Sequence, residues 1–352
     1  MCKRHALEQL PTELLILILF QIPDHNTLQS LVFASPACHQ SYLMIRHELL
    51  HYIMKRQYGE FLDLSEALVA IRSKGDYMEL HKEQAIALLD IRRRSKEINN
   101  LAITPESRAD EPTSLEEIID LLHFHKEMHF FLDDYSKNAP RPAWIDPSRW
   151  TQMLPLQLSG IEKRRFLRAL CRLQILSHIF HKPEEKPDGS YSGHYNQWFQ
   201  ELSDEDAWRL WYGALLPWES EEIGCVWSYL KTKYPPLYPE IIDKDEQPPG
   251  AQIECVDDLY QLPRFTEGLA SIGPRFLYRV LHATPRIRRD LIFTNASDYP
   301  WPWIGYQVAG SWDENIPWVY PADKCNNVAT SDELWSVILL SNNPTTAGKG
   351  QH

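Results

Sequence analysis

The sequence predicts a mainly α fold: a small N-terminal three-helix module, then a large irregular helical domain with Trp/Pro-rich loops. Apolar residues recur at helical spacing along much of the 352-residue chain. Two capping boxes, Ser114-x-x-Glu117 and Ser159-x-x-Glu162, mark helix starts. No internal repeat of about 20–50 residues is visible, which argues against leucine-rich-repeat and propeller architectures. We therefore expect one small module and one or two larger helical domains.

The first predicted helix is apolar almost all the way round. A surface helix normally carries one apolar stripe about 100° wide. Here one row at i, i+4 spacing is widened by two further leucines, and two residues cover the opposite side. The row consists of Leu10, Leu14, Ile18 and Ile22. The leucines that widen it are Leu15 and Leu19, and the residues on the opposite side are Leu17 and Phe20. Such a helix needs burial on two faces, so we expect a second protein to cover one of them.

Local signals divide the first sixty residues into three helices. Pro11 suits the first turn of a helix because its φ is fixed and it lacks an N–H. Pro23 ends that helix, and Thr27 is a candidate cap for a second one. Ser35 followed by Pro36 reads as an N-cap with proline at the first helical position, which starts a third helix.

This segment resembles an F-box of the filamentous-fungal type. The match is carried by Leu10-Pro11-x-Glu13-Leu14-Leu15, then Ile18, Ile22, Leu28 and Leu31 before Ala34-Ser35. It covers residues 5–45. Leu17, Ala34 and Cys38 depart from the family, which prefers a charged residue, Val and Trp there. In the family, this module is a helical trio that docks on the Skp-type adaptor of a cullin ubiquitin ligase.

The resemblance implies a non-catalytic substrate receptor without a cofactor. Its partners would be a Skp-type adaptor, through it a cullin, and a protein substrate that the sequence does not identify. It implies an F-box-like module over residues 1–50, a helical substrate-recognition region over 51–341 and a disordered tail over 342–352. The implied adaptor-binding residues are Leu10, Pro11, Leu14, Leu15, Ile18, Ile22, Leu28 and Leu31.

Composition narrows the function classes. A formal net charge of −12 argues against a nucleic-acid binder. The basic runs Arg92–Lys96 and Lys163–Arg165, the latter extended by Arg168 and Arg172, are typical of solvated helix faces. The N-terminal apolar block is too short to span a bilayer, so we expect no membrane partner and a cytoplasmic or nuclear location. Six scattered cysteines without C-x-x-C spacing predict neither a zinc ribbon nor a disulfide framework.

Two alternatives belong to other classes. In the first, the apolar N-terminus packs internally in a helical scaffold protein that binds no adaptor. In the second, His47-Glu48-Leu49-Leu50-His51 forms the H-E-x-x-H motif of a zinc peptidase. Met54 and Gln57 stand where an extended metzincin motif would have Gly and His.

A second group of histidines comprises His123, His125 and His129. We interpret this group as the exposed face of an amphipathic helix.

Tryptophan is abundant in the second half of the chain. Tryptophan is enriched at binding hot spots, so the aromatic loop over residues 299–320 is a candidate substrate-facing surface. Its tryptophans are Trp301, Trp303, Trp312 and Trp318. The alternative is that tryptophans fill gaps in the core and between helices.

Overall fold

The computed structural model describes residues 9–59, 62–75, 81–100, 111–180, 210–211, 215–241 and 262–295. Within these ranges every regular element is a helix, which confirms the predicted mainly α fold. No helix of this described part is long and apolar enough to cross a membrane. The predicted tail over residues 342–352 lies outside the described residues, and the proposed domain boundary near residue 50 stays a prediction.

Three helices form the N-terminal module: α1 (Thr12–Phe20), α2 (His25–Ala34) and α3 (Pro36–Tyr58). Pro11 is the N-cap of α1 and so lies one position before the first turn where the sequence placed it. Asp24 caps α2, because its carboxylate accepts a hydrogen bond of 2.9 Å from the Thr27 backbone N–H. The predicted cap at Thr27 was therefore wrong: Asp24 is closer to the helix start and accepts more strongly as an anion.

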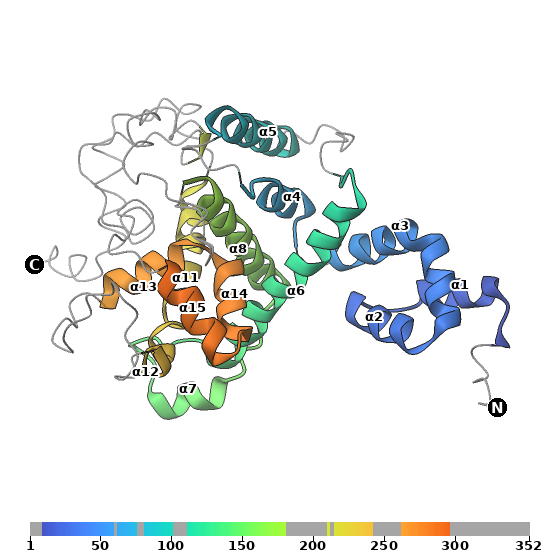
Figure 1. Ribbon diagram of the computed structural model, residues 1–352. Helices are drawn as coiled ribbons and strands as arrows, with labels where there is room; N and C mark the ends of the chain where they lie inside the picture. The colour runs from blue at the N-terminus through green and yellow to red at the C-terminus, as the bar shows by residue number, and fades with distance from the viewer. Residues whose placement is uncertain are drawn as a thin grey trace, which may run out of the picture.

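The third helix begins as predicted and runs further than expected. The Ser35 hydroxyl accepts a hydrogen bond from the Cys38 N–H, with Pro36 in the first turn. The helix continues past Ile53 to Tyr58 and contains one residue with non-helical dihedrals, Ile45. This kink divides α3 into a first part that packs within the module and a second part that reaches the rest of the protein (Figure 1).

In the rest of the protein, α8 is the helix on which α4, α6, α11 and α14 pack (Figure 1). From Leu167 to Phe180, nearly every residue of α8 is buried. Apolar residues of α6 and α8 form much of this core, among them Ile118, Phe131, Leu170 and Ile179. The helices that follow the module are α4 (Leu64–Arg72), α5 (Lys82–Asn100), α6 (Leu115–Asn138), α7 (Pro147–Met153), α8 (Gly160–Phe180), α11 (Pro217–Lys231), η4 (Pro235–Leu237), α12 (Tyr238–Ile241), α13 (Leu262–Ser271), α14 (Pro274–His282) and α15 (Pro285–Asn295).

The two predicted capping boxes differ in detail. At α8, the Glu162 carboxylate accepts from the Ser159 N–H at 2.7 Å while the Ser159 hydroxyl accepts from the Glu162 N–H at 3.3 Å. This is the complete reciprocal box. At α6, the Glu117 side chain reaches past Ser114 to the Thr113 N–H and also binds Arg72. Glu117 therefore links the start of α6 to α4, in addition to stabilising the helix end.

Gly273, the N-cap of α14, allows the start of that helix to approach α8 closely. Its φ of +107° lies in a region that essentially only glycine adopts, and a Cβ here would lie 2.8 Å from Gln174 Nε2 and Ser177 Oγ. Gly273→Ala is expected to destabilise the protein by about 3 kcal/mol, measured by urea unfolding. Gly75→Ala is the matched control, because Gly75 also has a positive φ but has no atom within 4 Å of the added Cβ. Equal losses in the two variants would show that contact with α8 contributes nothing.

Candidate functional site

The predicted adaptor-binding residues do not share one environment. Leu15 and Leu28 are buried, with exposed fractions of 3% and 2%, and both belong to the interior of the N-terminal module. Leu14 is 46% exposed, and Pro11 is also exposed. The others are partly exposed: Leu10, Ile18, Ile22 and Leu31. The structure therefore places Leu15 and Leu28 where they hold the module together, while the remaining six keep surface that a partner could contact.

The exposed apolar surface of the module includes residues that the sequence did not assign to docking. Leu17 is 60% exposed and lies one turn from Leu14 on the same face of α1. The prediction had placed Leu17 on the side opposite the docking row. Phe33, at the end of α2, is 80% exposed, and Leu43 and Met44 are exposed on α3. A lone exposed leucine needs no explanation, but several on one small module are typical of a contact surface.

The module is joined to the rest of the protein through the second part of α3. Tyr58 donates a hydrogen bond of 2.7 Å to the Leu121 carbonyl of α6. Arg56 donates to the Ile22 carbonyl after α1, and the Phe20 and Tyr52 rings meet edge to face at 5.4 Å. These contacts attach the end of α1 to the same stretch of α3 that packs on α6. The module is therefore held to α6 by specific contacts at the side of the molecule (Figure 1).

The H-E-x-x-H motif lies on α3. The His47 and His51 rings are nearly parallel with centroids 6.3 Å apart, and burial together with Lys55 lowers the pKa of His51. Among the described residues, no group of three or more His, Cys, Asp or Glu side chains is placed to hold a metal ion. Two histidines fall short of the three protein ligands that catalytic zinc sites use.

The histidines of α6 are less exposed than the sequence suggested. His123 is exposed and contacts His25 of α2. His125 and His129 are half-buried, and their rings stack with centroids 4.1 Å apart. Burial and the neighbouring His129 lower the pKa of His125 to about 3, so this imidazole is neutral at physiological pH. The exposed-face interpretation was wrong for His125 and His129, because His125 packs against Tyr58 of α3 and His129 stacks on His125.

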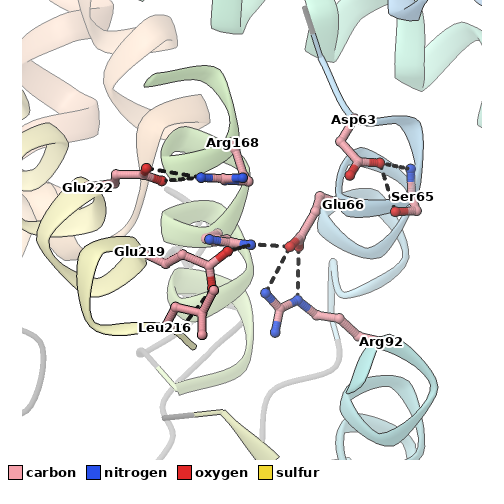
Figure 2. A network of polar contacts seen from close by, with 9 residues as sticks. Asp63, Ser65, Glu66, Arg92, Arg168, Leu216, Glu219 and Glu222 are labelled. Atoms are coloured by element: carbon pink, nitrogen blue, oxygen red, sulfur yellow. Dashed lines mark hydrogen bonds and ion pairs between the residues drawn. The ribbon is translucent and has the colours of Figure 1, made fainter. Parts of the chain in front are cut away.

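The basic runs were also assigned wrongly in part. Arg92 and Arg172 are 4% and 2% exposed and meet at a glutamate in the core. Figure 2 shows this glutamate, Glu66, with Arg92 pointing toward it. Glu66 of α4 accepts two hydrogen bonds of 2.9 Å from Arg92 and one of 3.0 Å from Arg172. Arg172 also donates to Glu219 of α11 at 2.9 Å. These two arginines connect four helices, so the prediction of a solvated helix face was wrong for Arg92 and Arg172.

The electrostatics of this buried network favour the charged forms. Burial alone would raise the pKa of Glu66, but Arg92 and Arg172 lower it to about 2. The Trp211 ring lies against the Arg92 guanidinium, with its centroid 4.4 Å from Cζ. The network contains two positive and two negative side chains, so its net charge is zero. We therefore interpret it as a structural element and not as a site for a charged ligand.

The predicted aromatic surface over residues 299–320 stays a prediction. Trp301, Trp303, Trp312 and Trp318 lie outside the described residues. Of the other tryptophans, Trp211 and Trp227 are buried in the core, as the gap-filling alternative expected. Trp144 is 86% exposed, the most exposed large hydrophobic side chain in the described part of the chain. Sequence analysis missed it because a single tryptophan in the proline-containing loop 139–146 produces no periodic pattern.

Comparison with known proteins gives no further assignment. No protein-family model, no curated protein and no solved structure matches this chain.

Proposed function

We propose that this protein is a non-catalytic substrate receptor of a Skp–cullin–F-box ubiquitin ligase. The observation that carries the proposal is the exposure of Leu14, which belongs to the Leu-Pro-x-Glu-Leu-Leu sequence, together with that of Leu17, two residues beyond this sequence. Removing a half-exposed leucine from water contributes about 1 kcal/mol. An exposed apolar face on a small helical module is therefore energetically suited to docking on another protein.

The geometry changes which residues we assign to the contact. We place Leu14 and Leu17 at its centre, with the partly exposed Leu10, Ile18 and Ile22 around them. Leu15 and Leu28 act indirectly, because they are buried in the module, where α1 and α2 each pack on α3. The contact between Tyr58 and Leu121 would then connect the adaptor-bound module to the helical region that receives a substrate.

The test is co-expression of the full chain with a Skp-type adaptor, followed by size-exclusion chromatography. The wild-type chain is expected to form a stable one-to-one complex. Leu14→Asp is expected to abolish the complex without unfolding the chain, because Leu14 is solvent-exposed and a charge there would lose its hydration in an apolar contact. Ile161→Asp is the matched control, since Ile161 is 66% exposed on α8, away from the module.

Two results would contradict the proposal. One is a wild-type monomer that ignores the adaptor, which would favour the scaffold alternative. The other is equal retention of the adaptor by Leu14→Asp and Ile161→Asp. Leu15→Asp cannot replace Leu14→Asp, because a charge at this buried position would disrupt the module itself.

A further inference from the structure

A second surface lies at the far end of α6, where α6, α7 and the start of α8 form a compact lobe. The Trp150 indole N–H donates to the Ala139 carbonyl at 3.2 Å, and the Leu156 N–H donates to the Ser136 carbonyl at 2.7 Å. The rings of Tyr135 and Phe166 lie 4.8 Å apart. These contacts connect residues 135–166, all of which are described, and we call this region the α6–α8 lobe.

The lobe presents Trp144 to solvent from a loop with its own hydrogen bonds. The Ile145 N–H donates to the Pro142 carbonyl at 3.1 Å, and the Arg141 guanidinium donates to the Ile145 carbonyl. Asp146 then caps α7 by accepting from the Ser148 N–H at 2.9 Å. An indole left 86% exposed on a loop with defined backbone hydrogen bonds is suited to act as an anchor for a partner, because little backbone entropy of the loop remains to be lost.

The same region is basic within an acidic protein. Residues 137–165 contain six Lys and Arg against two Asp and Glu, while the whole chain has a net charge of −12. The side chains of Lys137, Arg149 and Arg164 make no ion pair with any described residue. Both arginines are exposed. Within the described part of the chain, no acidic side chain pairs with these three positive charges, which leaves them for a partner.

We propose that the α6–α8 lobe docks an acidic peptide segment of a protein partner, with Trp144 as its apolar anchor. This proposal rests on the function proposed above and names the chemical class of the substrate. A short segment suits the charges of a single lobe, because charges more than about 8 Å away are screened at physiological salt. A DNA duplex or an anionic membrane would extend beyond the lobe and meet the acidic remainder of the surface.

The position of the lobe agrees with this role. The N-terminal module contacts α6 near Leu121, whereas the lobe begins at the end of the same helix, near Asn138. The intervening residues of a continuous helix span about 25 Å. In Figure 1, α7 and the module accordingly lie at different ends of the molecule. A substrate bound at the lobe would leave the exposed face of α1 free for the adaptor.

The experiment selects random linear peptides displayed on phage against the full-length protein, after depletion on the Trp144→Ala variant. Enriched peptides are expected to be rich in Asp and Glu and to contain an apolar residue. In fluorescence anisotropy, a selected peptide is expected to bind about tenfold more weakly to Trp144→Ala and to the Arg149→Glu/Arg164→Glu variant. Added salt should weaken its binding to the wild-type protein.

The controls are Trp218→Ala and Arg286→Glu, which change an exposed tryptophan and an exposed arginine elsewhere. Trp218 lies at the opposite end of α11 from the lobe: Glu219 binds Arg172, while Tyr229 packs on Tyr135. Both controls should bind the peptide as the wild-type protein does.

The proposal is overturned if no peptides are enriched, if the enriched peptides are neutral or basic, or if Trp144→Ala binds as tightly as wild type. It is also overturned if duplex DNA or phosphatidylserine vesicles bind this surface more tightly than the peptides do. The two proposals can fail separately. Leu14→Asp should keep full peptide binding, whereas Trp144→Ala should keep the adaptor complex.

Discussion

Replacing Glu66 by glutamine is expected to lower the free energy of unfolding by about 3–5 kcal/mol. The substitution keeps the shape of the side chain but removes the negative charge that faces Arg92 and Arg172 in the core. Glu219 compensates only one of these two guanidinium groups. Since Arg92 Nη1 and Arg172 Nη1 are buried and accepted by no group among the described residues, no other described acceptor replaces the lost carboxylate.

Urea unfolding of the full chain measures this effect. Glu267→Gln is the matched control, because Glu267 pairs with Lys231 and both side chains are about a third exposed at 32% and 27%. Such a pair contributes less than about 1 kcal/mol. If Glu66→Gln loses no more than Glu267→Gln, the buried network is not the stabilising element that its geometry indicates.

A double substitution separates a missing charge from lost packing. Removing one partner of a buried ion pair is costly, whereas replacing both by less polar groups of similar size can be nearly neutral. Glu66→Gln combined with Arg92→Met should therefore be more stable than the sum of the two single losses predicts. The expected coupling is about 1–3 kcal/mol. Additive losses would assign the effect to packing alone.

The network also shows what could not be predicted from sequence. Helix starts could be located because capping chemistry is local: Ser35, Ser114 and Ser159 each accept from an N–H three residues later. The burial of Arg172 could not, because its partner Glu66 is 106 residues away in the sequence. A run of basic residues looks the same whether its arginines point to solvent or into the core.

The candidate adaptor-binding site was also predictable only in part. The sequence located an apolar first helix, but a helix that is apolar all round gives no periodic signal to distinguish Leu14, which is exposed, from Leu15, which is buried. That choice depends on how α1 packs on α3, which is a tertiary contact. Trp144 is a different case, since exposure in a loop leaves no pattern in the sequence at all.

Mild acid is expected to destabilise the protein through two neutral histidines. Burial lowers the pKa of His178 to about 3, helped by the Arg275 charge, and burial with His129 lowers the pKa of His125 to about 3. In the unfolded chain both titrate near 6.5. Unfolding therefore takes up protons as the pH falls below about 6.5. Stability is fully present above this pH and decreases steadily down to about pH 3.

The contacts of His178 explain why it resists protonation. Nδ1 lies 3.1 Å from the Ala70 carbonyl and 3.0 Å from Ser73 Oγ, while Nε2 lies 2.8 Å from the Gln174 amide nitrogen. The neutral tautomer with its proton on Nδ1 satisfies these contacts, because Nε2 can then accept from Gln174. Protonation of Nε2 would place two donors face to face. It would also add a positive charge near Arg275 and Lys74, which Asp120 offsets only in part.

Between pH 7.5 and pH 5, the contribution of each of these two histidines to the free energy of unfolding should fall by about 2 kcal/mol. Together they should lower this free energy by about 4 kcal/mol. Urea titrations at half-unit pH intervals measure this slope. His178→Gln should reduce the slope between pH 6.5 and pH 5 by about half, whatever its effect at neutral pH. Glu66 and Glu117, whose pKa values are held at about 2, lose their stabilisation only below about pH 4.5 and do not contribute in this window. A flat stability profile down to pH 5 would therefore show that these two imidazoles reach water in the native protein.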